Sequence, residues 1–392
     1  MRILHAITAL LGPILLQAQT GQLILHPTIA LPNDSSLSHR LITALDSFLL
    51  PAQIPGDENR FVYEKERTET RLLLDELNGI RKSSKFNDTA FYKPYLTNVV
   101  PMKDSTYLVQ FSYIGVKDNL AYLRGSFQLI AHPSDRVFTF SSLLLQYTRS
   151  WKVLRAGTAI FHYRQVINKD KVKEFSQLAA SFDQKLKVTG KITELYCCDD
   201  LTELQRLTGV DYKSDYNGRT ESTWSASAGD RKIILLGNGN GSFAHFDPHD
   251  LFHDRLSLVI SRSQVNKAVD EGCAYLYGGS WGLPWKEIFK AFKKQVAAGK
   301  NINWVDIKET PVYFLTNGFK NNADNIVNAL LVKMIEKEKG FAGVWELLKS
   351  GPAEKGNGNY YRVLESLTGI TKAGYNEKIR ELIEQENRSH TD

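Results

Sequence analysis

The chain has 392 residues, which is enough for two or three domains of ordinary size. Hydrophobic residues make up 42% of the chain and charged residues 23%, a balance that excludes a disordered chain and is typical of a globular protein with a substantial core. The formal net charge is only +6, and basic residues are scattered along the chain. We therefore do not expect nucleic acid as the main partner.

Residues 1–19 have the composition of a secretory signal peptide. Arg2 precedes an apolar run over residues 3–16, and small and polar residues follow it. The run is too short to act as a stable membrane anchor, and no other apolar stretch approaches the length of a membrane span. We expect cleavage after Ala18 or Gln19, export to the periplasm or the extracellular space, and no membrane span in the mature protein.

Cysteine usage fits a fold that relies on its core. The chain has three cysteines, Cys197, Cys198 and Cys273. Adjacent cysteines rarely bridge each other, and the odd count leaves at least one free thiol unless chains pair. We therefore do not expect a disulfide framework.

Residues 20–154 are expected to form a small α+β domain. Apolar residues recur at helical spacing over Leu37–Leu50 and Arg60–Arg81. Between Leu96 and Val153 the residue pattern becomes typical of β-strands, and the sequence predicts an antiparallel meander. Its strands are predicted over Tyr107–Ile114, Ala121–Ile130 and Val137–Tyr147. This order of a helix followed by a meander vaguely resembles cystatin-like and nuclear-transport-factor-like modules, without a specific motif.

Residues 155–392 are expected to form a second domain, in which a sheet lobe leads into a helical lobe. Strands and helices alternate first, and almost continuous helix is predicted after Asp247. The predicted strands are Ala159–Tyr163, Lys191–Cys197 and Lys232–Leu236, and the predicted helices between them are Asp170–Lys187, capped by Asp170, and Leu201–Leu207. The fold class expected for the whole chain is α+β.

A pair of histidines carries the chemistry that the sequence indicates. Asp247 is a good helix cap, and the helix that it begins places His249 and His253 on one face, because they are four residues apart. Glu271, from a following helix, can complete a three-ligand site with one open position. Two imidazoles and a carboxylate favour Zn²⁺. His245 lies before the cap, so we interpret it as a rim residue.

Asp250 stands where the HExxH motif has the glutamate that acts as general base. Two interpretations stay open. An acid in the first turn of a helix stabilises the helix dipole, which is a structural role. Alternatively, Asp250 is the catalytic base, although its shorter arm leaves the carboxylate about 1.5 Å further from the water.

From about Phe161 to Ile383 the chain resembles the gluzincin-type, peptidase-MA-like zinc metallopeptidases, in particular a group of exported bacterial proteins. The match rests on His249, His253 and the segment Asp270-Glu271-Gly272-Cys273-Ala274. The resemblance implies that His249, His253 and Glu271 bind zinc. It also suggests that Gly272 and Ala274 let the glutamate helix pack close to the histidine helix.

The chain departs from the family pattern at the catalytic base, where it has HDxxH, and in the group that stabilises the oxyanion, for which Tyr313 is the nearest candidate. A Tyr in such a position is more often a core or strand aromatic. Three more aromatic residues are candidates for a substrate groove or for the core: Tyr277, Trp281 and Trp285.

Other polar features have simpler interpretations. Gly237–Ser242 follows a strand but lacks the register of a phosphate-binding loop, so a flexible lip over the cleft fits better. Asp254 and Arg255 are expected to be solvated charges. Cys273 is expected to point away from the metal as a packed thiol, because it lies two residues past Glu271.

The sequence thus predicts an exported, zinc-dependent, metallopeptidase-like protein that acts weakly or atypically on peptide or protein substrates, with Asp250 as its catalytic residue. The alternative is a catalytically inactive protein that keeps the peptidase fold and binds peptides or components of the cell envelope. In a third reading, the N-terminal domain performs the main task by binding a partner.

Overall fold

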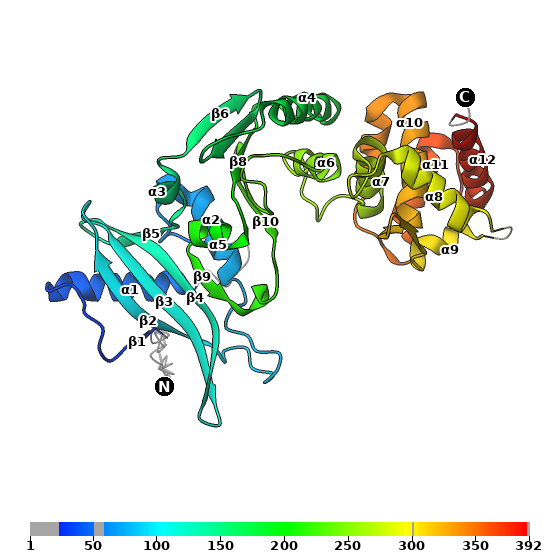
Figure 1. Cartoon of the computed structure of the whole chain (residues 1–392). Helices are drawn as coiled ribbons and strands as arrows, with labels where there is room; N and C mark the ends of the chain where they lie inside the picture. The colour runs from blue at the N-terminus through cyan, green and yellow to red at the C-terminus, as the bar shows by residue number, and fades with distance from the viewer. Residues whose placement is uncertain (1–22, 51–58, 300–301, 390–392) are drawn as a thin grey trace, which may run out of the picture. The chain divides into compact units, whose positions relative to one another are not determined.

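The computed structural model describes residues 23–50, 59–299 and 302–389, so the expected signal peptide lies outside the described residues (Figure 1). The protein is α+β, with 44% helix and 24% strand arranged as mixed sheets and a helical region. It divides into two compact units, Met1–Tyr147 with Gln205–Gly218, and Thr148–Leu204 with Arg219–Asp392. The boundary between the two units therefore lies a few residues before Arg155, where the sequence places the domain boundary. The sequence does not predict that Gln205–Gly218 belongs to the first unit.

The first unit contains one six-stranded sheet. Its strands are β1 (Ile24–Leu25), β2 (Lys93–Pro101), β3 (Tyr107–Lys117), β4 (Leu120–Pro133), β5 (Phe138–Ser141) and β9 (Val210–Lys213). The order is β1-β2-β3-β4-β5, and β9 pairs with β4. The antiparallel meander expected from the sequence is confirmed for β2 to β5, whereas β1 pairs with β2 in parallel.

The helices of the first unit are α1 (Ser35–Leu49), α2 (Arg67–Leu77) and α3 (Leu144–Thr148), whose last residue already belongs to the second unit. Helix α1 begins where the Asp34 side chain accepts hydrogen bonds from two backbone amides. It buries apolar residues against the sheet, and the Phe48 ring lies 5.1 Å from that of Phe140 on β5. Figure 1 shows α1 running across one face of the sheet.

Two predictions for this unit need correction. The helix expected over Arg60–Arg81 is shorter, because Asn78 leaves the helical conformation and Gly79 has a positive φ of 66°. The strand expected over Val137–Tyr147 ends at Ser141. Beyond it the Ser142 hydroxyl accepts a hydrogen bond from the backbone amide of Leu144, so the chain turns into α3.

The second unit begins with a five-stranded mixed sheet. Its strands are β6 (Lys152–Ala156), β7 (Ala159–Tyr163), β8 (Ile192–Cys197), β10 (Ser222–Ala228) and β11 (Arg231–Gly237). The order is β10-β11-β8-β7-β6, in which β7, β8 and β11 are parallel and the two edge strands are antiparallel to their neighbours. Strand β10 was not predicted, because small and polar residues dominate its sequence.

Helix α4 (Lys169–Leu186) connects β7 to β8, and α5 (Leu201–Thr208), whose second half already belongs to the first unit, follows β8. The cap of α4 is Asn168, whose side chain accepts a hydrogen bond from the backbone amide of Lys171, so the prediction that Asp170 caps this helix is wrong. Asp170 lies instead in the first turn, where an acid also favours the helix dipole.

The remainder of the second unit is mainly helical. Its helices are α6 (Pro248–Leu256), α7 (Lys267–Gly278), α8 (Trp285–Phe292), α9 (Trp304–Glu309), α10 (Ala323–Leu348), α11 (Gly358–Thr368) and α12 (Tyr375–Arg388). A hairpin of β12 (Tyr313–Thr316) and β13 (Phe319–Asn322) interrupts the almost continuous helix that the sequence predicted. One hydrophobic core joins β7, β8 and α4 to the helices from α6 to α12.

Arg255 fixes the position of α6, and the prediction that it is a solvated charge is wrong. Its side chain is only 2% exposed. Its guanidinium donates to Asp183 of α4 at 2.7 Å and to the Thr193 hydroxyl of β8 at 2.8 Å. Asp254 is also paired, since Lys232 of β11 donates to it at 2.6 Å. Helix α6 is therefore tied to the sheet and to α4.

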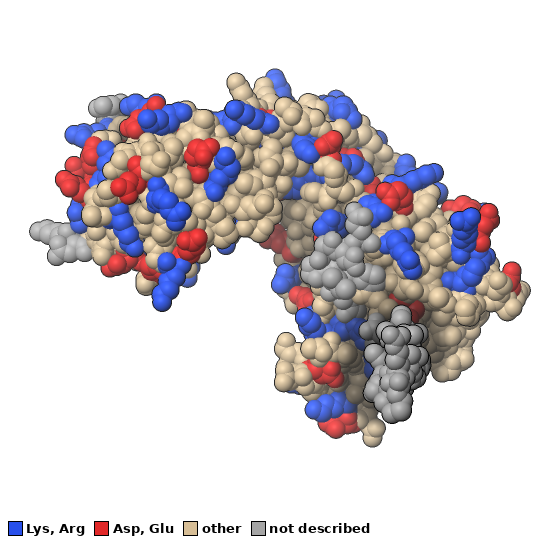
Figure 2. Space-filling view, turned by 180° about the vertical axis from the view of Figure 1, so that it is seen from behind, with Lys and Arg blue, Asp and Glu red and all other residues tan. Residues whose placement is uncertain are grey.

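All three cysteines are buried and free, as expected for Cys273, and burial raises the pKa of the Cys197 thiol to about 12. Among the described residues, no helix has both the length and the apolar character that crossing a bilayer requires. Figure 2 shows acidic and basic side chains interspersed over the face in view.

Candidate metal centre

Helix α6 presents the two histidines as the sequence predicted. The Asp247 side chain caps the helix by accepting a hydrogen bond from the backbone amide of His249 at 2.9 Å, and Pro248 occupies the first turn. The two imidazoles lie on the same face of α6, because His253 follows one helical turn after His249.

Helix α7 lies beside α6 and supplies the carboxylate of Glu271. The close approach of the two helices depends on Gly278, since a Cβ there would lie 2.7 Å from the Cα of His249. The prediction that Gly272 serves this purpose is wrong, because a Cβ on Gly272 would instead meet the backbone of α10, 2.8 Å from the Ala329 nitrogen. Glycines on α7 thus permit close packing against both neighbouring helices.

The side chains of His249, His253 and Glu271 converge. The two Nε2 atoms are 3.1 Å apart, and the Glu271 carboxylate oxygens lie 3.5 Å from Nε2 of His249 and 3.9 Å from Nε2 of His253. Donor atoms around a tetrahedral zinc are about 3.3 Å apart when zinc–ligand distances are about 2.0–2.1 Å. The three residues therefore form a group that can hold one metal ion, and His249, His253 and Glu271 together are called the metal-binding group below.

Each imidazole makes a hydrogen bond through Nδ1, on the side away from the group, which leaves both Nε2 atoms available to a cation. Nδ1 of His249 donates to the carbonyl of Gly279 at 2.8 Å, and Nδ1 of His253 donates to the Asp270 carboxylate at 2.7 Å. A backbone carbonyl and a carboxylate oxygen both act as acceptors here, so Nδ1 carries the hydrogen in each ring. In the neutral tautomers, two Nε2 lone pairs then face each other, an arrangement that a metal ion stabilises.

The imidazoles and the Glu271 carboxylate shift each other's pKa values. Burial alone lowers the pKa of His249, but hydrogen bonding to Glu271 and Gly279 and the charge of Glu271 outweigh it, so the pKa lies above its usual value. Burial alone raises the pKa of Glu271, but the two histidines lower it overall. A proton on His249 is consequently the natural competitor of a metal ion here.

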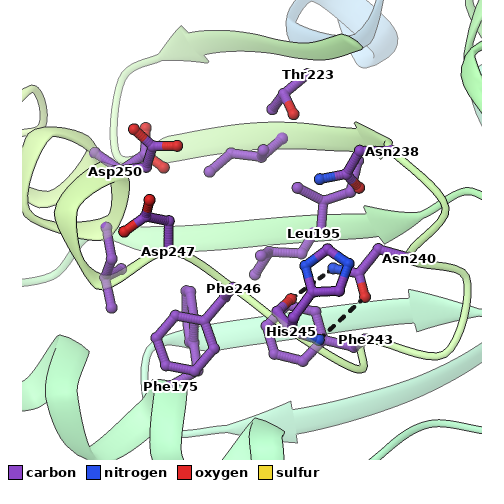
Figure 3. A pocket seen from close by; sticks show the side chains of 14 residues that line it. Phe175, Leu195, Thr223, Asn238, Asn240, Phe243, His245, Phe246, Asp247 and Asp250 are labelled. Atoms are coloured by element: carbon purple, nitrogen blue, oxygen red, sulfur yellow. Dashed lines mark hydrogen bonds between the residues drawn. The ribbon is translucent and has the colours of Figure 1, made fainter. Parts of the chain in front are cut away.

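Asp250 belongs to the neighbouring pocket that Figure 3 shows, together with Asp247, which caps α6, and Asp254 of the same helix. The pocket has a volume of about 150 Å³, and its lining residues do not include His249, His253 or Glu271. Asp250 is exposed, and its carboxylate has no hydrogen-bond partner within the described ranges. Desolvation by the surrounding protein and the charge of Asp247 raise its pKa.

The other walls of this pocket come from the sheet and from the loop before α6. Thr223 of β10 and apolar side chains of β8 and β11 form one wall, and Phe175 of α4 forms another. Asn238 and Asn240, in the loop expected to be a flexible lip, border the opening. Asn240 is buried and donates to the His245 carbonyl at 2.6 Å, so hydrogen bonds fix this loop. His245 lies at the rim, outside the metal-binding group.

Tyr275 and Asp270 contact the metal-binding group, and sequence reasoning assigned a role to neither. The Tyr275 ring lies 5.1 Å from that of His249, edge to face, and its hydroxyl donates to Asn321 of β13 at 3.1 Å. Tyr275 is four residues past Glu271 on α7, and this helical spacing is the signal that would have identified it. Asp270 carries no such signal, since only the tertiary contact with His253 reveals its role.

The aromatic candidates have different positions. Tyr313 is an exposed residue on β12, and the Lys320 ammonium lies 3.8 Å from the centre of its ring. Tyr277 and Trp285 face the helical region, where they donate to Glu336 and Glu386 at 2.7 Å. Trp281 is exposed and stacks on Phe319 of β13. None of these four aromatic residues lines the pocket beside Asp250.

Comparisons of the chain with protein-family models, with curated proteins and with solved structures find no match.

Proposed function

We propose that the protein is an exported, zinc-dependent, peptidase-like hydrolase in which His249, His253 and Glu271 hold the metal. The observation that carries the proposal is the pair of Nε2 atoms 3.1 Å apart, each on a ring whose Nδ1 already donates to a fixed acceptor. The Glu271 carboxylate beside them supplies the negative charge that zinc prefers. When bound, zinc acts as a Lewis acid toward a substrate carbonyl.

A peptide is the substrate class that the surroundings favour. Strand β10 is the last strand of its sheet, so one of its backbone edges has no partner among the described strands. An extended peptide can add to such an edge through main-chain hydrogen bonds. Thr223 of β10 and Asp250 of α6 border the same pocket, which brings a peptide bound along β10 near the carboxylate.

Asp250 is the group available to accept a proton from an attacking water. Its carboxylate has no hydrogen-bond partner in the described part of the chain, and its raised pKa makes it a stronger base than an ordinary aspartate. Its short side chain limits its reach toward the three ligands, so we expect slow hydrolysis. Asp270 and the carbonyl of Gly279 orient the two imidazoles.

A second candidate is a binding protein that keeps the site without catalysis. It is favoured by the pocket lining, which groups Asp250 with Asp247 and Asp254 and includes none of the three ligands. In this alternative Asp250 contributes to peptide binding and to the start of α6.

The test is hydrolysis of a diverse peptide library by the zinc-loaded protein. The proposal predicts slow cleavage that a chelator abolishes, that added zinc restores, and that His253→Ala lacks. His245→Ala is the matched control, because it removes a nearby imidazole outside the metal-binding group. Zinc-replete protein that binds peptides but cleaves none would favour the second candidate.

A further inference from the structure

The β3–β4 hairpin ends in a narrow tip with an unusual set of exposed side chains. The two strands are joined by Asp118 and Asn119, both with positive φ (53° and 61°), as in the tight two-residue turns of hairpins. Lys117 pairs with Leu120 directly before this turn. Figure 1 shows the hairpin projecting beyond the neighbouring strands of its sheet.

Aliphatic side chains at this tip face solvent. Val116 is 59% exposed, Leu120 is 61% exposed and Leu123 is 46% exposed. Burial of large aliphatic side chains usually stabilises a fold, so three exposed ones within eight residues contribute little to the stability of this unit. Val116 pairs with Ala121 and Lys117 with Leu120, so Val116 and Leu120 lie on opposite faces and the tip exposes apolar side chains on both sides. Exposure of this kind is typical of contact with another apolar phase or partner.

Aromatic rings and lysines lie beside the aliphatic tip, on the hairpin face that carries Lys117 and Tyr122. The Phe86 and Phe91 rings lie 5.2 Å and 6.0 Å from that of Tyr122 on β4. The Lys117 ammonium lies 4.6 Å from the centre of the Phe86 ring, and that of Lys85 lies 5.2 Å from the Tyr122 ring. Aromatic rings and lysines with apolar stems are the side chains that proteins place at the level of lipid headgroups.

The two chain segments that form the tip and the ring cluster carry mostly positive charge. Residues 81–93 and 116–123 include five cationic side chains, Arg81, Lys82, Lys85, Lys93 and Lys117, and only two acidic ones, Asp88 and Asp118. Basic side chains complement an anionic lipid surface, because lysines and arginines are attracted to its negative potential.

We infer that the β3–β4 tip is a membrane-docking element that inserts Val116 and Leu120 among the lipids of an anionic bilayer while the surrounding lysines contact the headgroups. A protein partner is less suitable, because three side chains at a narrow tip fall well short of the roughly 800 Å² per partner that a stable protein interface buries. The inference is independent of the metal site and of hydrolysis.

The test is co-sedimentation with lipid vesicles. A chain beginning at Thr20 keeps every residue that the structure describes and lacks the apolar leader, which would bind lipid by itself. We expect it to sediment with vesicles of phosphatidylglycerol and phosphatidylcholine in equal parts, to bind phosphatidylcholine alone far less, and to be released by salt, because salt screens the charge attraction.

The double variant Val116→Thr with Leu120→Thr should bind anionic vesicles about tenfold more weakly, since it removes apolar area while keeping residues suited to strands. Lys85→Gln with Lys117→Gln should weaken binding by a similar factor. The matched control is Val100→Thr with Val137→Thr, two other exposed valines of the same unit, and it should bind like the wild type. Wild-type protein that ignores anionic vesicles, or a folded tip variant that binds them equally well, would overturn the inference.

Discussion

The buried carboxylate of Asp270 decides how His253 presents its metal-facing nitrogen. Asp270 is 2% exposed and accepts the Nδ1 hydrogen of His253 at 2.7 Å, so it fixes both the orientation and the tautomer of the ring. His249 relies for the same purpose on the carbonyl of Gly279, which no side-chain substitution removes. Substitution of Asp270 therefore tests whether the hydrogen-bond acceptors behind the imidazoles contribute to metal binding.

We predict that Asp270→Asn weakens zinc affinity by about 10–100-fold, because the ring loses its charged acceptor. The measurement is competition with a calibrated chelator. Asp250→Asn is the matched control and should change the affinity by less than about twofold, since Asp250 is one helical position away from a ligand but outside the metal-binding group. Equal affinity in wild type and Asp270→Asn would contradict the positioning role.

Zinc affinity should also depend on pH through His249. Its pKa is raised above the usual value of 6.5, and zinc requires the deprotonated nitrogen. As pH falls, the proton therefore begins to displace zinc at a higher pH than for an ordinary histidine. A titration of zinc affinity against pH should show this decline, and His245→Ala, which leaves all three proposed ligands in place, should show the same decline. A decline that starts only below the usual histidine pKa would argue against the protonation of His249 as its cause.

The next prediction concerns the length of the side chain at position 250, which sets how close its carboxylate comes to the attacking water. General acid–base catalysis contributes about a hundredfold to ten-thousandfold, and a displaced base loses part of this factor. Asp250→Glu should therefore raise peptide hydrolysis by at least about tenfold, measured as kcat/KM on any substrate that the wild type cleaves. Unchanged or absent hydrolysis in a zinc-replete Asp250→Glu variant would favour the binding protein.

At the scale of elements, the site depends on how closely α7 approaches α6. Gly278 lies where a Cβ would meet the backbone at the start of α6, and backbone atoms move less readily than the ends of flexible side chains. Arg255 holds the other end of α6 against α4 and β8. The ligand helix therefore has little freedom to adjust.

Gly278→Ala should lower the free energy of unfolding by about 1–3 kcal/mol and weaken zinc binding as well, because α6 must shift. Denaturant unfolding and chelator competition measure the two effects. Gly358→Ala at the start of α11 is the control, since a Cβ there meets nothing within 4 Å and its φ of −58° is helical. A Gly278→Ala variant as stable as this control would refute the packing argument.

Elements with strong local patterns could be predicted from the sequence. Strands β7 and β8 are rich in branched and aromatic residues, and Asp247 marks the start of α6. The edge strand β10 could not be predicted, because its small polar residues form a strand only through pairing with β11. The burial of Arg255 likewise depends on Asp183, which is 72 residues away in the chain.

At the scale of the whole molecule, the two units are interleaved in sequence. The segment Gln205–Gly218 leaves the second unit and supplies β9, which pairs with β4 of the first unit. Such a return depends on long-range pairing, so composition and periodicity did not reveal it. His249, His253 and Glu271, by contrast, come from two consecutive helices of one unit, and the convergence of these three side chains could be predicted from spacing.

The central claim, one zinc ion per chain held by His249, His253 and Glu271, is tested most directly by metal analysis of the whole purified protein after zinc loading and dialysis. The account predicts about one zinc per chain in the wild type and in His245→Ala, and loss of that zinc in His253→Ala. Equal zinc content in wild type and His253→Ala, with both proteins folded, would contradict it.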